Sequence, residues 1–191
     1  HPRSIYFVDD VFTMDTEWLR EFAPRYNRFI GLPFYCTANP ATIRDEELYL
    51  LKQAHGQMIG FGMQSCDEEY RRTSLKRYGS NKRIRAVAEL CHYLKINFSF
   101  DHILNLPNEP ENNQIEAIEF YNDTRPDIIN TFDMTYLPRI ELNKYLDEKT
   151  RMEVENGNIR TGMFIRSKSF VPSVFSILPL LPFGWIRILV R

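Results

Sequence analysis

Short apolar runs rich in β-branched and aromatic residues recur along the first two thirds of the chain, and each run ends in polar side chains. Such runs predict strands. They lie at residues 4–8, 34–37, 58–63, 96–104 and 128–134. The third run ends in Gly-x-Gly followed by Gln64 and Ser65, so it predicts a buried strand that carries two polar side chains to a rim.

The segments between these runs place apolar residues three and four positions apart, which is the spacing of one helix face. Four helices are expected: one capped by Asp15 or Thr16, one from Asp45 to Gly56, one capped by Ser80, and one that ends near Asn122. Pro24 predicts a kink or a restart in the first of them. The stretch 71–77, which is rich in Arg and Lys, reads as a cationic loop.

Strands that alternate with helices indicate repeated βαβ units and therefore a parallel sheet. An open doubly wound sheet usually carries a glycine-rich phosphate loop after its first strand, and none is seen here. A closed barrel needs eight strands. The expected fold is therefore α/β, an incomplete (β/α) TIM-type barrel section of about five parallel strands over residues 1–140, with its polar strand ends on one face.

Residues 141–191 read as a C-terminal helical extension with an apolar tail. Residues 142–157 form a charged helical stretch, and 170–191 are apolar and broken by prolines. The proline-free runs are far shorter than the roughly 20 residues of a membrane span. Trp185 with Arg187 and Arg191 would suit contact with a membrane surface, and packing against another region or disorder are the alternatives.

The composition of the chain excludes few classes of protein. The 191 residues carry a net charge of −1 and are 43% hydrophobic, which is ordinary for a globular domain or part of a larger one and gives no support for nucleic-acid binding. Cys36, Cys66 and Cys91 are far apart and form no C-x-x-C pair, which indicates a reducing, cytoplasmic setting. Because the chain begins with His1 and enters a strand almost at once, it is expected to be a section of a longer protein.

Four motifs follow one another on consecutive βα units: Phe-Val-Asp-Asp-Val-Phe at 7–12, Gly-Met-Gln-Ser at 62–65, Lys76-Arg77, and Asn-Leu-Pro-Asn-Glu-Pro at 105–110. In this order they resemble the radical S-adenosylmethionine (SAM) barrel, most of all its cobalamin-binding-domain branch. That branch carries F-x-D-D-x-F, G-x-E/Q-S, K-R and G-L-P-G-E-T. The resemblance covers residues 4 to 140, and the apolar tail also resembles extensions in that branch.

Two departures from the family stand out. The family's C-x-x-x-C-x-x-C loop is absent, and the three cysteines cannot replace it because a cluster needs thiolates that converge from one short loop. The chain is expected to begin after that loop and by itself to be incapable of radical chemistry. Asn105 and Asn108 replace two glycines of G-L-P-G-E-T, and asparagine is the residue besides glycine that best tolerates a positive φ, so the turn is expected to persist.

The resemblance implies a SAM-binding site beside a 4Fe–4S cluster whose ligands lie upstream, with 5′-deoxyadenosyl radical or methyl-transfer chemistry and cobalamin on an upstream domain. Asp10 would accept from the SAM ammonium group, and Gln64 and Ser65 would bind its ribose or amino-acid end. Arg77 or Lys76 would pair with its carboxylate. The alternatives are helix capping for Asp9 and Asp10, a structural turn for Gln64 and Ser65, and a solvated face or nucleic-acid patch for the seven basic residues of 71–85.

The resemblance also places Asn105 and Leu106 near adenine. Substrate-side candidates are His102, Tyr136 and Arg139, with a satisfied core histidine as the alternative for His102. The implied partners are a small-molecule substrate, the upstream part of the same protein and an electron donor such as flavodoxin or ferredoxin, and no nucleic acid is expected. The rival hypotheses are a non-catalytic barrel fragment that binds an anionic small molecule through Lys76 and Arg77, and a membrane-surface module that uses residues 170–191.

Overall fold

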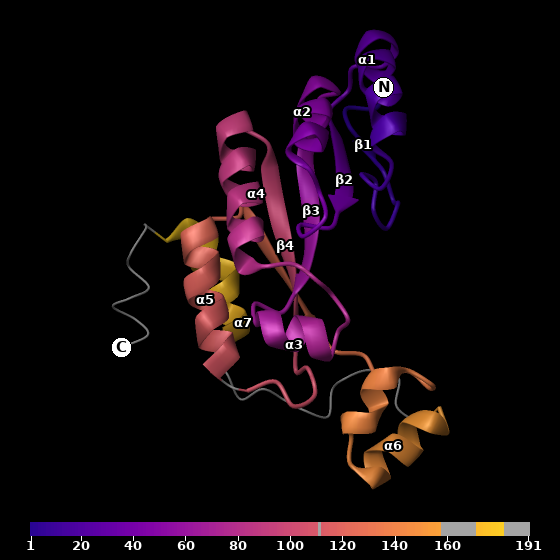
Figure 1. The fold of residues 1–191 in the computed structure, drawn as a ribbon, viewed down its shortest axis with the longest axis vertical. Helices are drawn as coiled ribbons and strands as arrows, with labels where there is room; N and C mark the ends of the chain where they lie inside the picture. Colours follow the sequence, from indigo (N-terminus) through magenta and orange to yellow (C-terminus); the bar gives the residue numbers. More distant parts are fainter. Residues whose placement is uncertain (111, 158–170, 182–191) are drawn as a thin grey trace.

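The computed structural model of the chain describes residues 1–110, 112–157 and 171–181. Five parallel strands form one sheet in the order of the sequence (Figure 1): β1(Ile5–Tyr6), β2(Phe34–Ala38), β3(Gly56–Gln64), β4(Asn97–Leu104) and β5(Ile128–Asp133). The sheet curls into about half of a (β/α) barrel. This confirms the expected fold class, an incomplete TIM-type barrel section.

The connecting helices are α1(Thr16–Phe29), α2(Asp45–Gln53), α3(Glu68–Thr73), α4(Asn81–Leu94) and α5(Asn112–Thr124). The predicted caps are confirmed, since Asp15 accepts from the Trp18 N–H at 3.0 Å and Ser80 accepts from the Arg83 N–H at 3.1 Å. The prediction of a cationic loop from residue 71 was wrong in part, because α3 occupies its first three residues. Asp67 caps α3 by accepting the Tyr70 N–H at 3.0 Å.

Two helix-breaking signals act differently from the prediction. Pro24 lies inside α1, which continues unbroken to Phe29. Pro24 is exposed, so water can reach the backbone carbonyl that lacks its N–H donor. Helix α2 ends before Gly56, with His55 at φ 65°, and Gly56 instead begins β3, where an added Cβ would lie 2.9 Å from the carbonyl oxygen of Leu51.

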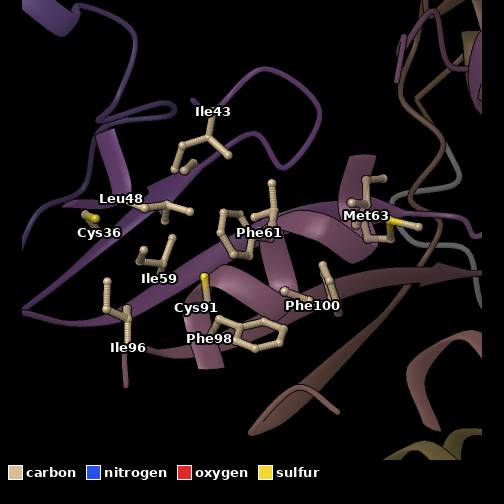
Figure 2. Close-up of a cluster of buried hydrophobic side chains, with 14 of the residues drawn as sticks. Cys36, Ile43, Leu48, Ile59, Phe61, Met63, Cys91, Ile96, Phe98 and Phe100 are labelled. Carbon is tan, nitrogen blue, oxygen red and sulfur yellow. The ribbon is translucent and has the colours of Figure 1, made fainter. Parts of the chain in front are cut away.

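The main core lies between the helices and the convex face of the sheet. Alternate strand positions face it, among them Ile59 and Phe61 of β3 and Phe98 of β4. Figure 2 shows them in one cluster with Leu48 of α2 and Cys91 of α4. Each such side chain contributes about 1.5–3 kcal/mol by leaving water. This packing fixes which strand positions remain for the concave face.

The C-terminal extension contributes η1(Glu141–Tyr145), α6(Glu148–Glu155), α7(Val171–Ile177) and η2(Leu178–Leu180). Helix α7 packs against α5 and β5, and Phe175 is 0% exposed in the main core. Val154 of α6 belongs to a second small cluster beyond the carboxyl ends of the strands, and α6 stands apart from the sheet in Figure 1. Among the described residues, no helix has the length and apolar character needed to cross a membrane. Membrane contact was predicted for the tail 170–191, and Trp185, Arg187 and Arg191, which suggested it, lie outside the described residues.

Candidate functional site

The concave face of the sheet holds a trough at the carboxyl ends of the strands. Its cavity has a volume of about 590 Å³ and so falls in the usual range for small-molecule sites. The lining residues come from β1 to β4 and the segments that follow them: Tyr6, Val8, Asp9, Asp10, Val11, Thr37, Ala38, Asn39, Gly60, Gly62, Gln64, Arg77 and Asp101. Carboxyl ends of parallel strands are the usual place for ligand sites in such folds.

The segment after β1 forms one wall of the trough. Thr37 of β2 holds it, because the Thr37 hydroxyl donates to the carbonyl oxygens of Asp9 and Asp10, the latter at 3.1 Å. The Phe12 N–H also donates to the Thr37 carbonyl oxygen at 2.9 Å. These bonds leave both aspartates exposed at the cavity.

The end of β3 supplies an amide, and the segment after α3 supplies a guanidinium. Gln64 takes a left-handed backbone conformation with φ 69°, and Arg77 donates to the Gly62 carbonyl oxygen at 3.1 Å. A Cβ at Gly62 would lie 2.8 Å from Gln64 Nε2 and 3.4 Å from an Arg77 guanidinium nitrogen. Glycine at this position therefore lets the two groups come together. Within residues 1–110, 112–157 and 171–181, Arg77 forms no ion pair.

The floor of the trough contains residues that lie outside the four sequence motifs. Tyr6 stacks on Tyr35 with ring centroids 4.3 Å apart, and Asp101 accepts from Asn130 Nδ2 at 2.9 Å. Burial, the Tyr6 hydroxyl and the Asp101 carboxylate raise the pKa of Tyr35, so its hydroxyl stays protonated. The sequence signal for Asp101 was the alternation of side chains along a strand. Because Phe100 points into the core, its neighbour Asp101 must point to the other face of the sheet.

Three carboxylates and one guanidinium line this cavity: Asp9, Asp10 and Asp101, with Arg77. A purely anionic ligand would meet an excess of like charge there. A zwitterion with additional positive charge would find carboxylates for its cationic groups and Arg77 for its own carboxylate.

Of the residues predicted to bind SAM, Asp10, Gln64 and Arg77 come together at the cavity. Ser65 points away from it. Ser65 is fully buried, and its hydroxyl donates to Glu109 Oε1 at 2.5 Å rather than lining the cavity. Glu109, in the 105–110 loop, was not singled out from the sequence.

Asn105 and Leu106 follow β4 at the same end of the sheet but do not line the cavity. Asn105 donates from Nδ2 to Asp133 at 2.7 Å, and Leu106 is buried in the second cluster beside Tyr136. Asn105 and Asn108 have φ of 60° and 58°. The expected left-handed positions in this turn are therefore confirmed.

The substrate-side candidates lie away from the trough. His102 is 1% exposed and points from the convex face of β4 toward α5, where it contacts Tyr121, and burial lowers its pKa to about 4. The buried Tyr136 hydroxyl donates to the Asn105 carbonyl oxygen at 3.2 Å. Arg139 is exposed, with its backbone N–H directed at Glu155.

Much of the basic segment 71–85 is engaged in the fold. The buried Arg71 donates to the carbonyl oxygens of Ser65 at 2.7 Å and Gly79 at 3.1 Å. Three further arginines form ion pairs: Arg72 with Glu69, Arg83 with Asp45, and Arg85 with Asp123. The segment therefore does not present one continuous cationic face.

The cysteines do not fit an iron–sulfur cluster. Cys36, Cys66 and Cys91 are buried on separate segments, and burial raises the pKa of each thiol to about 12. In the part of the chain that the structure describes, no three His, Cys, Asp or Glu side chains are grouped to hold a metal ion. The described residues therefore offer no set of ligands for a cluster.

Known structures share this fold. The radical SAM enzyme coproporphyrinogen III oxidase (HemN) from Escherichia coli matches with a TM-score of 0.66 at 13% identity, over 81% of this chain and 38% of its own. The radical SAM methyltransferase TsrM from Kitasatospora setae, solved with cobalamin and a 4Fe–4S cluster, matches with a TM-score of 0.61 at 14% identity, over 69% of this chain and 27% of its own. Elp3 from the archaeon Methanocaldococcus infernus matches with a TM-score of 0.60 at 13% identity, over 84% of this chain and 42% of its own.

No protein-family model and no curated protein sequence matches the chain. At the identities above, the likeness shows the fold alone: a half-barrel of the kind found in radical SAM enzymes. The chain spans less than half the length of each of these three proteins.

Proposed function

We propose that this chain is the SAM-binding half-barrel of a radical SAM enzyme and that the trough is its SAM site. The observation that carries the proposal is the convergence of Asp10, Gln64 and Arg77 on one cavity. Their order along the chain follows the family's motifs, and the fold is that of the structural neighbours.

Each of these groups has a role that its chemistry suits. The Asp10 carboxylate accepts from the ammonium group of the methionine moiety, and Arg77 donates to its carboxylate. Gln64 has both a donor and an acceptor for the ribose hydroxyls. Bound SAM supplies one-electron chemistry in this superfamily, and the residues here hold and orient it.

The charge of the trough favours SAM over the anionic ligand considered from the sequence. SAM carries a sulfonium, an ammonium and a carboxylate. Binding through Asp10 and Arg77 leaves Asp9 and Asp101 to balance the remaining positive charge. A phosphate or dicarboxylate would have a single cation and three repelling carboxylates.

The other members of the proposed system lie outside the described residues. They are the cluster and its cysteine loop, an electron donor of the flavodoxin or ferredoxin type, and a small-molecule substrate. Motif order and the likeness to TsrM favour the cobalamin-dependent branch.

Calorimetric titration of the chain with SAM, decarboxylated SAM and inorganic phosphate tests the proposal. We expect Arg77→Met to weaken SAM binding by about 10- to 100-fold, the equivalent of one lost charge-assisted contact. Decarboxylated SAM lacks the carboxylate that Arg77 would bind, so Arg77→Met should leave its affinity unchanged. The matched control is Arg72→Met, which removes an exposed guanidinium paired with Glu69 outside the cavity.

Saturable SAM binding that Arg77→Met weakens and Arg72→Met spares would support the site. Equal effects of the two variants, or binding of phosphate in preference to SAM, would overturn it. Asp10→Asn supplies a second check, because it should weaken SAM and decarboxylated SAM alike.

A further inference from the structure

A buried series of hydrogen-bonded side chains joins the end of β3 to the 105–110 loop and to α5. Ser65 donates to Glu109 Oε1 at 2.5 Å, and Gln114 Nε2 donates to Glu109 Oε2 at 2.8 Å. His102 Nε2 lies 3.4 Å from Gln114 Oε1, and His102 Nδ1 lies 2.8 Å from the Tyr121 hydroxyl. Glu109 is thus the link between a strand end that lines the trough and the interior.

The donors and acceptors in this series of hydrogen bonds can be assigned consistently. Gln114 uses its N–H group on Glu109, so its oxygen accepts from His102, which carries its hydrogen on Nε2. Nδ1 is then the acceptor for the Tyr121 hydroxyl. This arrangement suits an ionised Glu109, because both of its oxygens face donors.

The surroundings of Glu109 oppose that ionised form. Glu109 is half-buried, and burial together with the nearby Asp67 carboxylate raises its pKa to about 7 despite the hydrogen bonds from Ser65 and Gln114. The Arg71 guanidinium on α3 is directed to the Ser65 carbonyl oxygen and not to Glu109.

The other polar groups packed around Glu109 do not offset this burial. Tyr70 of α3 donates to the Pro107 carbonyl oxygen, and Asp67 accepts from Asn113 of α5. Tyr121 and the Cys66 thiol lie beside each other, and burial keeps both protonated.

Glu109 can accept a proton when the Gln114 amide turns over. The protonated carboxyl then donates from Oε2 to the Gln114 side-chain oxygen, which gives up its 3.4 Å contact with His102 Nε2, and Ser65 keeps its bond to Oε1. One proton enters from solvent, and no other charge changes in the interior.

We propose that Glu109 is a positioning residue which clamps the end of β3 through Ser65, and that a proton on Glu109 closes the clamp. When the 105–110 loop moves away from Ser65, Glu109 becomes exposed to water. A carboxyl in water holds its proton less tightly than the buried one. The closed form therefore binds the proton more strongly, and loss of the proton favours opening.

The consequence for the trough follows from chain connectivity. Ser65 is covalently joined to Gln64, which lines the cavity, and the Asp67 N–H donates to the Ser65 hydroxyl at 3.2 Å. When the clamp opens, Gln64 loses its fixed position. The effect on SAM rests on the function proposed above, whereas the clamp itself does not.

Amide hydrogen exchange measured by NMR tests the clamp, with the Ser65, Asp67 and Glu109 amides as probes and rates corrected for the intrinsic effect of pH. We expect the opening constant to rise about tenfold per pH unit from pH 5 and to level off near pH 7. Glu109→Gln, a neutral mimic of the closed form, should abolish this dependence and keep the probes protected. Ser65→Ala removes the hydroxyl that joins β3 to Glu109 and accepts from the Asp67 N–H, so the Ser65 and Asp67 probes should exchange faster and lose their pH dependence.

Glu155→Gln is the matched control, because Glu155 also holds a loop, through the Arg139 N–H and Asn143 Nδ2, but forms no hydrogen bond with a clamp residue. It should leave the pH profile of the probes unchanged. A flat wild-type profile, or a slope that persists in Glu109→Gln, would refute the proposal.

Saturating SAM should slow exchange at the probes in the wild type. If SAM fails to bind while the Glu109-dependent profile is present, the proposed function fails and the clamp stands. If SAM binds and the profile is flat, the proposed function stands and the clamp fails.

Discussion

The hydroxyl of Tyr35 lies over Gly60 of the neighbouring strand so closely that a Cβ on Gly60 would come within 2.0 Å of its oxygen. Glycine at this position therefore allows the Tyr6–Tyr35 stack to lie flat on the floor of the trough. Any larger residue must displace the tyrosine.

We predict that Gly60→Ala destabilises the chain by about 1–3 kcal/mol, the usual range for overpacking. It should also weaken ligand binding, because the Tyr35 ring would move into the cavity. Urea denaturation and SAM titration measure the two effects. Tyr35→Phe in the Gly60→Ala background should recover part of the stability, since the hydroxyl makes the closest contact; no recovery would mean that Tyr35 is not the obstacle.

Arg71 and Arg72 are adjacent and should differ strongly in importance. The buried guanidinium of Arg71 bonds the Ser65 and Gly79 carbonyl oxygens, whereas Arg72 is exposed beside Glu69. Lysine cannot reproduce the planar fork of arginine. We expect Arg71→Lys to lower the free energy of unfolding by about 2–3 kcal/mol and Arg72→Lys by less than about 1 kcal/mol. Equal losses in urea denaturation would contradict this assignment.

Phe175 should be the main anchor of α7. Its ring lies 4.9 Å from His102 and 5.4 Å from Tyr121, measured between centroids. Phe175→Ala should cost about 3–5 kcal/mol. Leu180→Ala, at a position 81% exposed, should change stability by no more than about 0.5 kcal/mol. A small effect of Phe175→Ala would mean that α7 does not close this part of the core.

Acidification should destabilise the chain through His102. Burial lowers the pKa of His102 to about 4, below the ordinary value of 6.5. The unfolded chain therefore binds the proton first, and stability falls as the pH drops from 6.5 toward 4. We expect this group to account for about 1–3 kcal/mol of destabilisation at pH 4.5.

His102→Gln removes this group and should flatten its share of the profile in thermal melts between pH 4.5 and 7. Glu109 acts in the opposite direction, because its raised pKa makes the fold bind a proton more tightly than the unfolded chain does. Stability in Glu109→Gln should therefore fall more steeply on acidification than in the wild type. A shallower fall in Glu109→Gln would contradict the raised pKa of Glu109.

Local patterns in the sequence were sufficient to predict the five strands and most of the helices. Period-2 and period-3.6 spacing and the caps at Asp15 and Ser80 are properties of neighbouring residues. The turn at Asn105 and Asn108 was predictable for the same reason, because tolerance of a positive φ belongs to the residue itself. The strand ends could be placed on one face because parallel strands all run in the same direction.

Alternation along each strand separates the side chains of its two faces, but the tertiary structure alone decided which face forms the trough and what the polar side chains meet. A one-residue step along β4 sends Asp101 to the trough and His102 to the core, and register with β3 sets which is which. Ser65 turns from the trough because Glu109, 44 positions along the chain, lies close enough to accept its hydrogen. Such contacts depend on the curvature of the sheet and the packing of α5 against it, and no local pattern records the distance between residues that meet only after folding.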